Sequence, residues 1–98
     1  MVLLTEDEIE DKMLSLAGWE FEDEGGDMIT KNFEFRDFDC AVDFVNKIKD
    51  VANREDHHPD ILIYGYKFVE VMLRTHDLDG LTEKDFEVAL LIDEIIGV

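Results

Sequence analysis

The sequence contains a single cysteine, few basic residues and no long apolar run. Because Cys40 has no partner in the chain, an intrachain disulfide is excluded, and its apolar surroundings favour a space-filling role. No apolar stretch approaches the roughly 20 residues of a membrane span. The apolar start, residues 1–4, is too short and uncharged for a signal peptide. We therefore expect a cytoplasmic protein.

Basic residues are scarce: the chain has 9 lysines and arginines against 26 aspartates and glutamates, a formal net charge of -17. Such a surface repels phosphate backbones and anionic lipid headgroups, so neither nucleic acid nor a membrane is an expected partner. The acidic residues are spread along the chain. We interpret them as a solubilising surface, with adaptation to high salt, which screens self-repulsion, as the alternative.

Motifs for phosphate binding and nucleophilic catalysis are missing. Gly25-Gly26 is not followed by a helix start, and neither Ser15 nor Cys40 lies near a histidine in the sequence. The 98 residues suit one domain, residues 1–98. A domain of this size buries only about 60–65% of its unfolded surface, so a homo-oligomer is expected to add stability.

Two helices are predicted from capping residues and apolar periodicity. Thr5 and Glu8 fit a capping box that starts the first helix, which Gly18 is expected to end. Apolar residues recur with a period of 3.6 between residues 41 and 52, which predicts a second helix with Asp39 as its N-cap.

A third helix is predicted near the C-terminus. Residues 82–85 resemble another capping box, with Asp85 at the third helical position. The apolar residues of the following segment, 86–96, cover more than one face. Part of this helix is therefore expected to contact another subunit.

Alternating apolar and polar residues predict four strands, at 19–21, 29–35, 61–64 and 67–75. Lys31 breaks the apolar face of the second strand and is therefore expected at an edge. The order α-β-β-α-β-β-α predicts a two-layer α+β fold. Two hairpins form a four-stranded antiparallel sheet, and the three helices pack on one of its faces.

The chain has three histidines, and two of them, His57 and His58, are adjacent in a polar loop. Pro59 lacks an amide donor and pushes His58 towards extended geometry. The last strand is expected to run back antiparallel to the strand that follows this loop, which brings His76 beside the other two. Because imidazoles titrate near neutral pH, three of them at the rim of a sheet indicate proton transfer.

Each of these residues also has a simpler interpretation. Histidines in loops are usually surface residues, and Asp85 is explained by a helix cap alone. The histidines and Asp60 form a possible metal site, but adjacent residues rarely point at one ion and no zinc-type spacing is present, so no metal is predicted. Trp19 is interpreted as packing rather than as a ligand platform.

Three motifs follow one another along the chain: Asp56-His57-His58-Pro59-Asp60, Thr75-His76-Asp77, and Gly80-Leu81-Thr82-Glu83-Lys84-Asp85. In this order and spacing they resemble the pterin-4a-carbinolamine dehydratase family. The similarity also includes Gly18-Trp19 and residues 33–38, and it extends over nearly the whole chain from Thr5 onwards. The predicted order of helices and strands is also the order of that family.

The resemblance implies a hydro-lyase of pterin recycling. Such an enzyme removes water from a 4a-hydroxy-tetrahydropterin to give quinonoid dihydropterin, without a metal or organic cofactor. It implies that His57 and His76 transfer protons, because the hydroxyl must leave as water and a ring nitrogen must lose a proton. It implies that His58 chiefly binds and orients the pterin ring.

Four further residues are implied to bind or support the substrate. Asp85 would orient a histidine through a hydrogen bond, and Pro59 would shape the wall of the pocket. Asp56 and Asp60, on either side of the histidines and the proline, are the remaining polar positions.

The chain departs from the family at Ile61, where many members have an aromatic residue, and at Asn53, where some have glutamate. It also has one extra residue near Gly65. These departures leave substrate affinity and preference open. Two alternatives remain: a dehydratase-like dimerisation or assembly factor without activity, for which the apolar last helix offers a surface, or an enzyme that acts on another pterin. Family members form dimers and tetramers, so the resemblance also implies a homo-oligomer.

Overall fold

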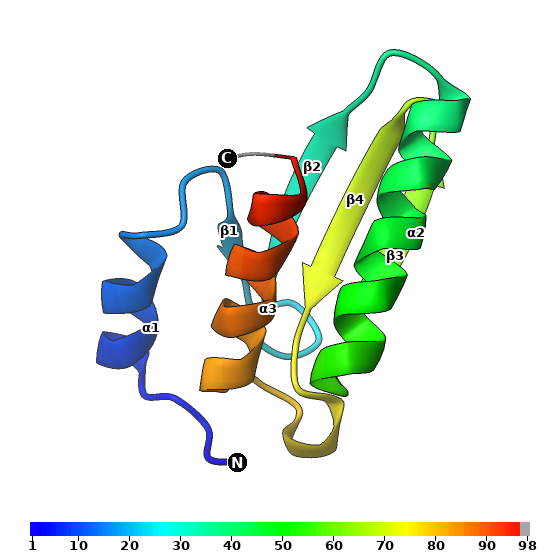
Figure 1. Cartoon of the computed structure of the whole chain (residues 1–98). Coiled ribbons are helices and arrows are strands. Elements are labelled where there is room, and N and C mark those ends of the chain that lie inside the picture. The colour runs from blue at the N-terminus through cyan, green and yellow to red at the C-terminus, as the bar shows by residue number, and fades with distance from the viewer. Residues whose placement is uncertain (97–98) are drawn as a thin grey trace.

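A four-stranded antiparallel sheet, with its strands in the order β1-β2-β4-β3, organises the chain. The computed structural model describes residues 1–96. The strands are β1 (Glu20–Glu22), β2 (Met28–Glu34), β3 (Asp60–Tyr64) and β4 (Phe68–Leu73). Three helices lie on one side of this sheet, α1 (Glu6–Met13), α2 (Phe38–Glu55) and α3 (Glu83–Ile95) (Figure 1). The predicted element order and fold class are confirmed.

Alternation along β4 separates the two faces of the sheet. Val69, Val71 and Leu73 are fully buried beneath the helices, whereas the residues between them are only partly buried. On β2, Phe33 is paired with Val69 and Ile29 with Leu73, so the buried faces of the two central strands coincide. Burying one such side chain contributes about 1.5–3 kcal/mol, which makes this face the main source of stability.

Helix α3 lies between α1 and α2 (Figure 1). Its buried residues include Phe86, Val88 and Ile92, which belong to the same core cluster as the inner face of the sheet. Contacts within the chain therefore explain why this helix is apolar on more than one face. Leu90 is 50% exposed, and the expected contact with another subunit stays a prediction.

Lys31 does not lie at an edge of the sheet, and the prediction that it does is wrong. Strand β2 lies between β1 and β4, and Lys31 shares its helix-facing side. Its Nζ lies 2.9 Å from Asp93 Oδ1, and Trp19 Nε1 donates to Asp93 Oδ2 at 3.1 Å. A buried carboxylate on α3 thus neutralises the ammonium group, which explains a charge on an apolar face. Trp19 is a core residue, as predicted.

Helix α1 is shorter than predicted. Its capping box is confirmed, since Glu8 N donates to Thr5 Oγ1 at 3.2 Å and Thr5 N donates to Glu8 Oε1 at 2.8 Å. The helix ends at Met13 rather than near Gly18. Beyond it, tight turns direct Leu16 into the core, and Gly18 has a positive φ of 86°, which glycine adopts without strain.

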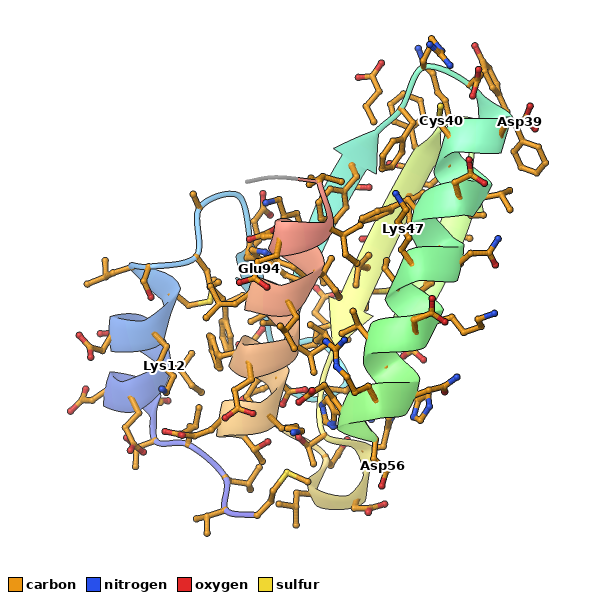
Figure 2. All side chains as sticks on the ribbon, in the orientation of Figure 1. Lys12, Asp39, Cys40, Lys47, Asp56 and Glu94 are labelled. Atoms are coloured by element: carbon orange, nitrogen blue, oxygen red, sulfur yellow. The ribbon has the colours of Figure 1, made fainter. Side chains whose placement is uncertain are left out.

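Helix α2 is capped by Asp37 and not, as predicted, by Asp39. Asp37 Oδ1 accepts a hydrogen bond from Cys40 N at 2.9 Å. Asp39 lies in the first turn, at the end of α2 opposite to Asp56 (Figure 2). The helix begins before its apolar period does, so the periodicity placed the cap two residues too late.

We expect Asp37→Ala to destabilise the protein more than the control variant Asp39→Ala, since only Asp37 satisfies a free helix amide. The hydrogen bond from Cys40 N lowers the pKa of Asp37 below its usual value. A lowered folded-state pKa stabilises the protein above the ordinary aspartate range, and that contribution is lost as pH falls. Urea unfolding of the three proteins from about pH 7 down to about pH 3 should show the Asp37→Ala defect shrinking; a constant defect would contradict this assignment.

Candidate active site

The three histidines lie at one end of the sheet, where four segments of the chain meet. Helix α2 ends there, and β4 runs back into a 3-10 helix, η1 (His76–Leu78), that leads to α3 (Figure 1). Asp56 ends α2 in a left-handed conformation, with φ 52° and ψ 43°, and marks this end of the helix in Figure 2. Asp60 pairs with Met72 across β3 and β4, so the end of β4 returns beside the histidine loop as predicted.

His57 is buried, with 7% of its surface exposed, and it is paired with a fully buried carboxylate. Its Nε2 lies 2.7 Å from Asp85 Oδ1. The two residues are 28 positions apart, and helices α2 and α3 bring them together. A buried histidine held by a carboxylate has a fixed ring orientation, which is what directed proton transfer requires.

Asp85 also caps helix α3. Its Oδ2 accepts hydrogen bonds from Thr82 N and from Thr75 Oγ1, both at 2.9 Å. Thr82 and Asp85 form the predicted capping box. Asp85 therefore both caps the helix and supports a histidine. The two roles are compatible because Oδ2 accepts from Thr82 N, whereas Oδ1 contacts His57.

His58 turns away from this pair. It is exposed, and its Nε2 lies 3.0 Å from Oδ1 of Asn53, in the last turn of α2. Asn53 departs from the glutamate of some family members, yet it still supplies a hydrogen-bond partner to this histidine. Its neutral amide orients the ring without adding a further negative charge.

His76 is also exposed. Its side chain is 53% exposed, and Nε2 lies 4.0 Å from Asp60 Oδ1. It opens η1 and directly follows Thr75, whose hydroxyl donates to Asp85. A short buried path thus links the two histidines: His57 contacts Asp85, Asp85 accepts from Thr75, and Thr75 is the chain neighbour of His76.

The remaining predicted residues frame this cluster. Pro59 is half-buried and Asp56 is exposed. Ile61 pairs with Val71 and packs against the core. No group of three or more His, Cys, Asp or Glu side chains within residues 1–96 is arranged to hold a metal ion. Within this cluster His57 is buried, whereas His58 and His76 are exposed.

An ion pair that the sequence did not reveal joins the two helices beside His57. Lys84 Nζ lies 3.0 Å from Glu55 Oε1, and both side chains are partly buried. The hydrogen bond between them raises the pKa of Lys84 and lowers the pKa of Glu55. Glu55 precedes His57 by two residues and Lys84 directly precedes Asp85, so the pair ties together the segments that carry both.

Known proteins resemble this chain over nearly its whole length. Residues 2–95 match the family model described as pterin 4 alpha carbinolamine dehydratase. The chain belongs to this family. It is therefore a hydro-lyase by family, and the resemblance of its three motifs is confirmed. A dehydratase-named relative from Sulfurisphaera tokodaii is 44% identical over 96 residues, which cover 98% of this chain and 99% of the relative.

Solved structures show the same fold. A protein from Brucella melitensis described as a transcriptional coactivator/pterin dehydratase is 36% identical, with a TM-score of 0.90 over 98% of this chain and 100% of that one. A pterin dehydratase-like protein identified as a RuBisCO assembly factor in the alpha-carboxysome shares the dehydratase fold at 21% identity, with a TM-score of 0.68 over 82% of this chain and 90% of that one. Within residues 1–96 of this dehydratase-family protein, no helix is long and apolar enough to cross a bilayer.

Proposed function

We propose that the protein dehydrates a 4a-hydroxy-tetrahydropterin to quinonoid dihydropterin by histidine acid–base catalysis, in the recycling of tetrahydrobiopterin or a related pterin. The observation that supports this most directly is the pairing of His57 with the buried Asp85, next to the exposed His76. His57 is held by Asp85 and His76 is accessible. Each of the two proton transfers at a bound pterin ring can therefore use its own histidine.

The reaction needs one proton delivered and one removed. A protonated imidazole gives its proton to the 4a-hydroxyl, the carbon–oxygen bond breaks, and water leaves. The lone pair of the adjacent ring nitrogen forms a carbon–nitrogen double bond, and the hydrogen on that nitrogen passes to the second imidazole as a proton. His57 and His76 carry out these two steps, and the chemistry returns the pair to its starting number of protons.

The other residues of the site bind and orient the ring. His58 is turned outwards and steadied by Asn53, which suits a contact with the substrate rather than a buried support. Pro59 shapes the wall beside it. Asp60 Oδ1 lies 4.0 Å from His76 Nε2, and Asp56 contributes a polar edge.

A rate assay on a synthetic 4a-hydroxy-tetrahydropterin tests the proposal. The protein should accelerate dehydration over the spontaneous rate by at least about 10²-fold, the lower end for general acid–base catalysis. Running the assay at low and at high salt also tests whether the acidic surface is an adaptation to salt. A spontaneous rate in both conditions would refute the proposal. Activity on a different pterin would reassign the substrate, and a stoichiometric protein partner without pterin binding would favour an assembly role.

We further propose that the protein is a cytoplasmic homo-oligomer. The small core supports self-association, because a domain of this length gains stability from further burial. Light scattering coupled to size-exclusion chromatography distinguishes a dimer from a tetramer. A monomer at micromolar concentration would contradict this part of the proposal.

A further inference from the structure

Two buried hydroxyl groups lie behind the Asp85 carboxylate and take no part in the proposed reaction. Thr75 is 4% exposed and Thr82 is 1% exposed. Thr75 Oγ1 lies 2.9 Å from Asp85 Oδ2, and the two threonine oxygens are 2.8 Å apart. These contacts continue the hydrogen bond between His57 and Asp85 into the interior.

The protons of this chain of contacts can be assigned from the donors and acceptors present. An ionised carboxylate accepts hydrogen bonds and donates none, so the Thr75 hydroxyl must give its single proton to Asp85. Thr75 Oγ1 then has no proton left for Thr82. The Thr82 hydroxyl lies 2.8 Å from Thr75 Oγ1 and 3.4 Å from Met1 Sδ, and because a thioether is the weaker acceptor, Thr82 donates to Thr75. Thr82 Oγ1 in turn accepts from the backbone N–H of Lys84 at 3.3 Å.

The same count places the proton between His57 and Asp85. A carboxyl group is intrinsically a stronger acid than an imidazolium, so the shared proton stays on the imidazole nitrogen. Asp85 Oδ2 already accepts from Thr75 Oγ1 and from Thr82 N, so both of its oxygens act as acceptors. Neutral His57 therefore carries its hydrogen on Nε2 and has its lone pair on Nδ1.

We propose that Thr75 and Thr82 are positioning residues that keep Asp85 as an acceptor, and that His57 exchanges its proton with the substrate through Nδ1. The role of Nδ1 in catalysis rests on the proposed dehydratase function. The order of the hydrogen bonds does not, because it follows from the buried contacts alone. Asp85 thus determines which imidazole nitrogen is free for the substrate, and the two threonines act on His57 only through Asp85.

Nitrogen-15 NMR of histidine-labelled protein tests the arrangement without any assay of activity. At a pH where His57 is neutral, we expect its Nε2 to show the shift of a protonated nitrogen and Nδ1 that of an unprotonated one. A His57→Gln variant assigns the signals among the three histidines. A neutral His57 with its hydrogen on Nδ1 would overturn the proposal.

Substitution of Thr75 tests the positioning role. Thr75→Val removes the hydroxyl at nearly constant shape, and we expect mixed tautomers of His57 and a kcat about 10-fold lower with little change in KM, as for groups that act through another residue. Thr75→Ser keeps the hydroxyl and should restore both values, so it also controls for a folding defect.

Thr30→Val is the matched control. Thr30 is buried to a similar degree, and its hydroxyl donates to Glu22 Oε2 at 3.0 Å, on the sheet face away from the helices. This variant should lose stability while keeping the His57 tautomer and kcat. An unchanged tautomer and kcat in Thr75→Val would overturn the positioning role. The expected tautomer in a wild-type protein without activity would refute the dehydratase function and leave the hydrogen-bond order standing.

Discussion

Replacing His76 with alanine is expected to lower kcat for pterin dehydration by at least about 10²-fold, because the variant lacks one of the two groups that move protons. The side chain is 53% exposed and its nearest charged partner, Asp60, lies 4.0 Å away. Its removal should therefore leave the unfolding midpoint almost unchanged. Stopped-flow absorbance on the synthetic carbinolamine, with thermal unfolding in parallel, separates the catalytic from the structural effect.

Asp77→Ala is the matched control for this variant. Asp77 is exposed and follows His76 in the same 3-10 helix, but it has no part in the proposed reaction. Its kcat should stay within about twofold of the wild type, the range of an uninvolved surface substitution. His58→Ala should instead raise KM more than it lowers kcat, since His58 binds the ring. Equal rates for His76→Ala and Asp77→Ala would exclude His76 from proton transfer.

The largest effect on stability is expected for Asp93→Ala, which should reduce the free energy of unfolding by about 3–5 kcal/mol. The substitution leaves the Lys31 ammonium group without its carboxylate partner in a largely buried position, and it removes the acceptor of Trp19 Nε1. Native domains are stable by only about 5–15 kcal/mol, so this is a large share of the total. Urea unfolding followed by circular dichroism measures it.

Glu94→Ala controls for the change in helix composition, because Glu94 is the next residue of α3 and is exposed. It should cost little. The double variant Lys31→Met/Asp93→Leu replaces both charges by apolar groups and should recover most of the lost stability, since a buried pair contributes little over a well-packed apolar one. An Asp93→Ala protein as stable as Glu94→Ala would mean that water, not Asp93, solvates Lys31.

Much of the fold follows from short-range sequence patterns. Thr5 with Glu8, and Thr82 with Asp85, mark two helix starts because each capping box lies within four residues. The alternation of apolar and polar residues along the strands predicts the inner face of the sheet, because it too is a pattern among near neighbours in the sequence. Lys31 could not be interpreted correctly, because its partner Asp93 lies 62 positions away and a lone charge on an apolar face does not reveal its counterion.

The sequence predicts the residues of the candidate site better than it predicts the hydrogen bonds between them. Strand reversal brings His76 towards His57, and the resemblance to the dehydratase family assigns a role to each histidine. The contact between His57 and Asp85 joins two helices, which no local pattern predicts. Thr75 stands next to His76 in a quoted motif, but its buried bond to Asp85 depends on how β4 meets α3.

The double use of Asp85 has a consequence for the history of the protein. Active-site residues commonly reduce stability, so replacing one of them often gives a more stable but inactive protein. Here the carboxylate that holds His57 is also the N3 member of the capping box of α3, so a substitution weakens the fold as well as the catalyst. Selection for an intact fold alone would therefore preserve Asp85, and a relative that has lost its activity can be expected to retain it after its histidines have changed.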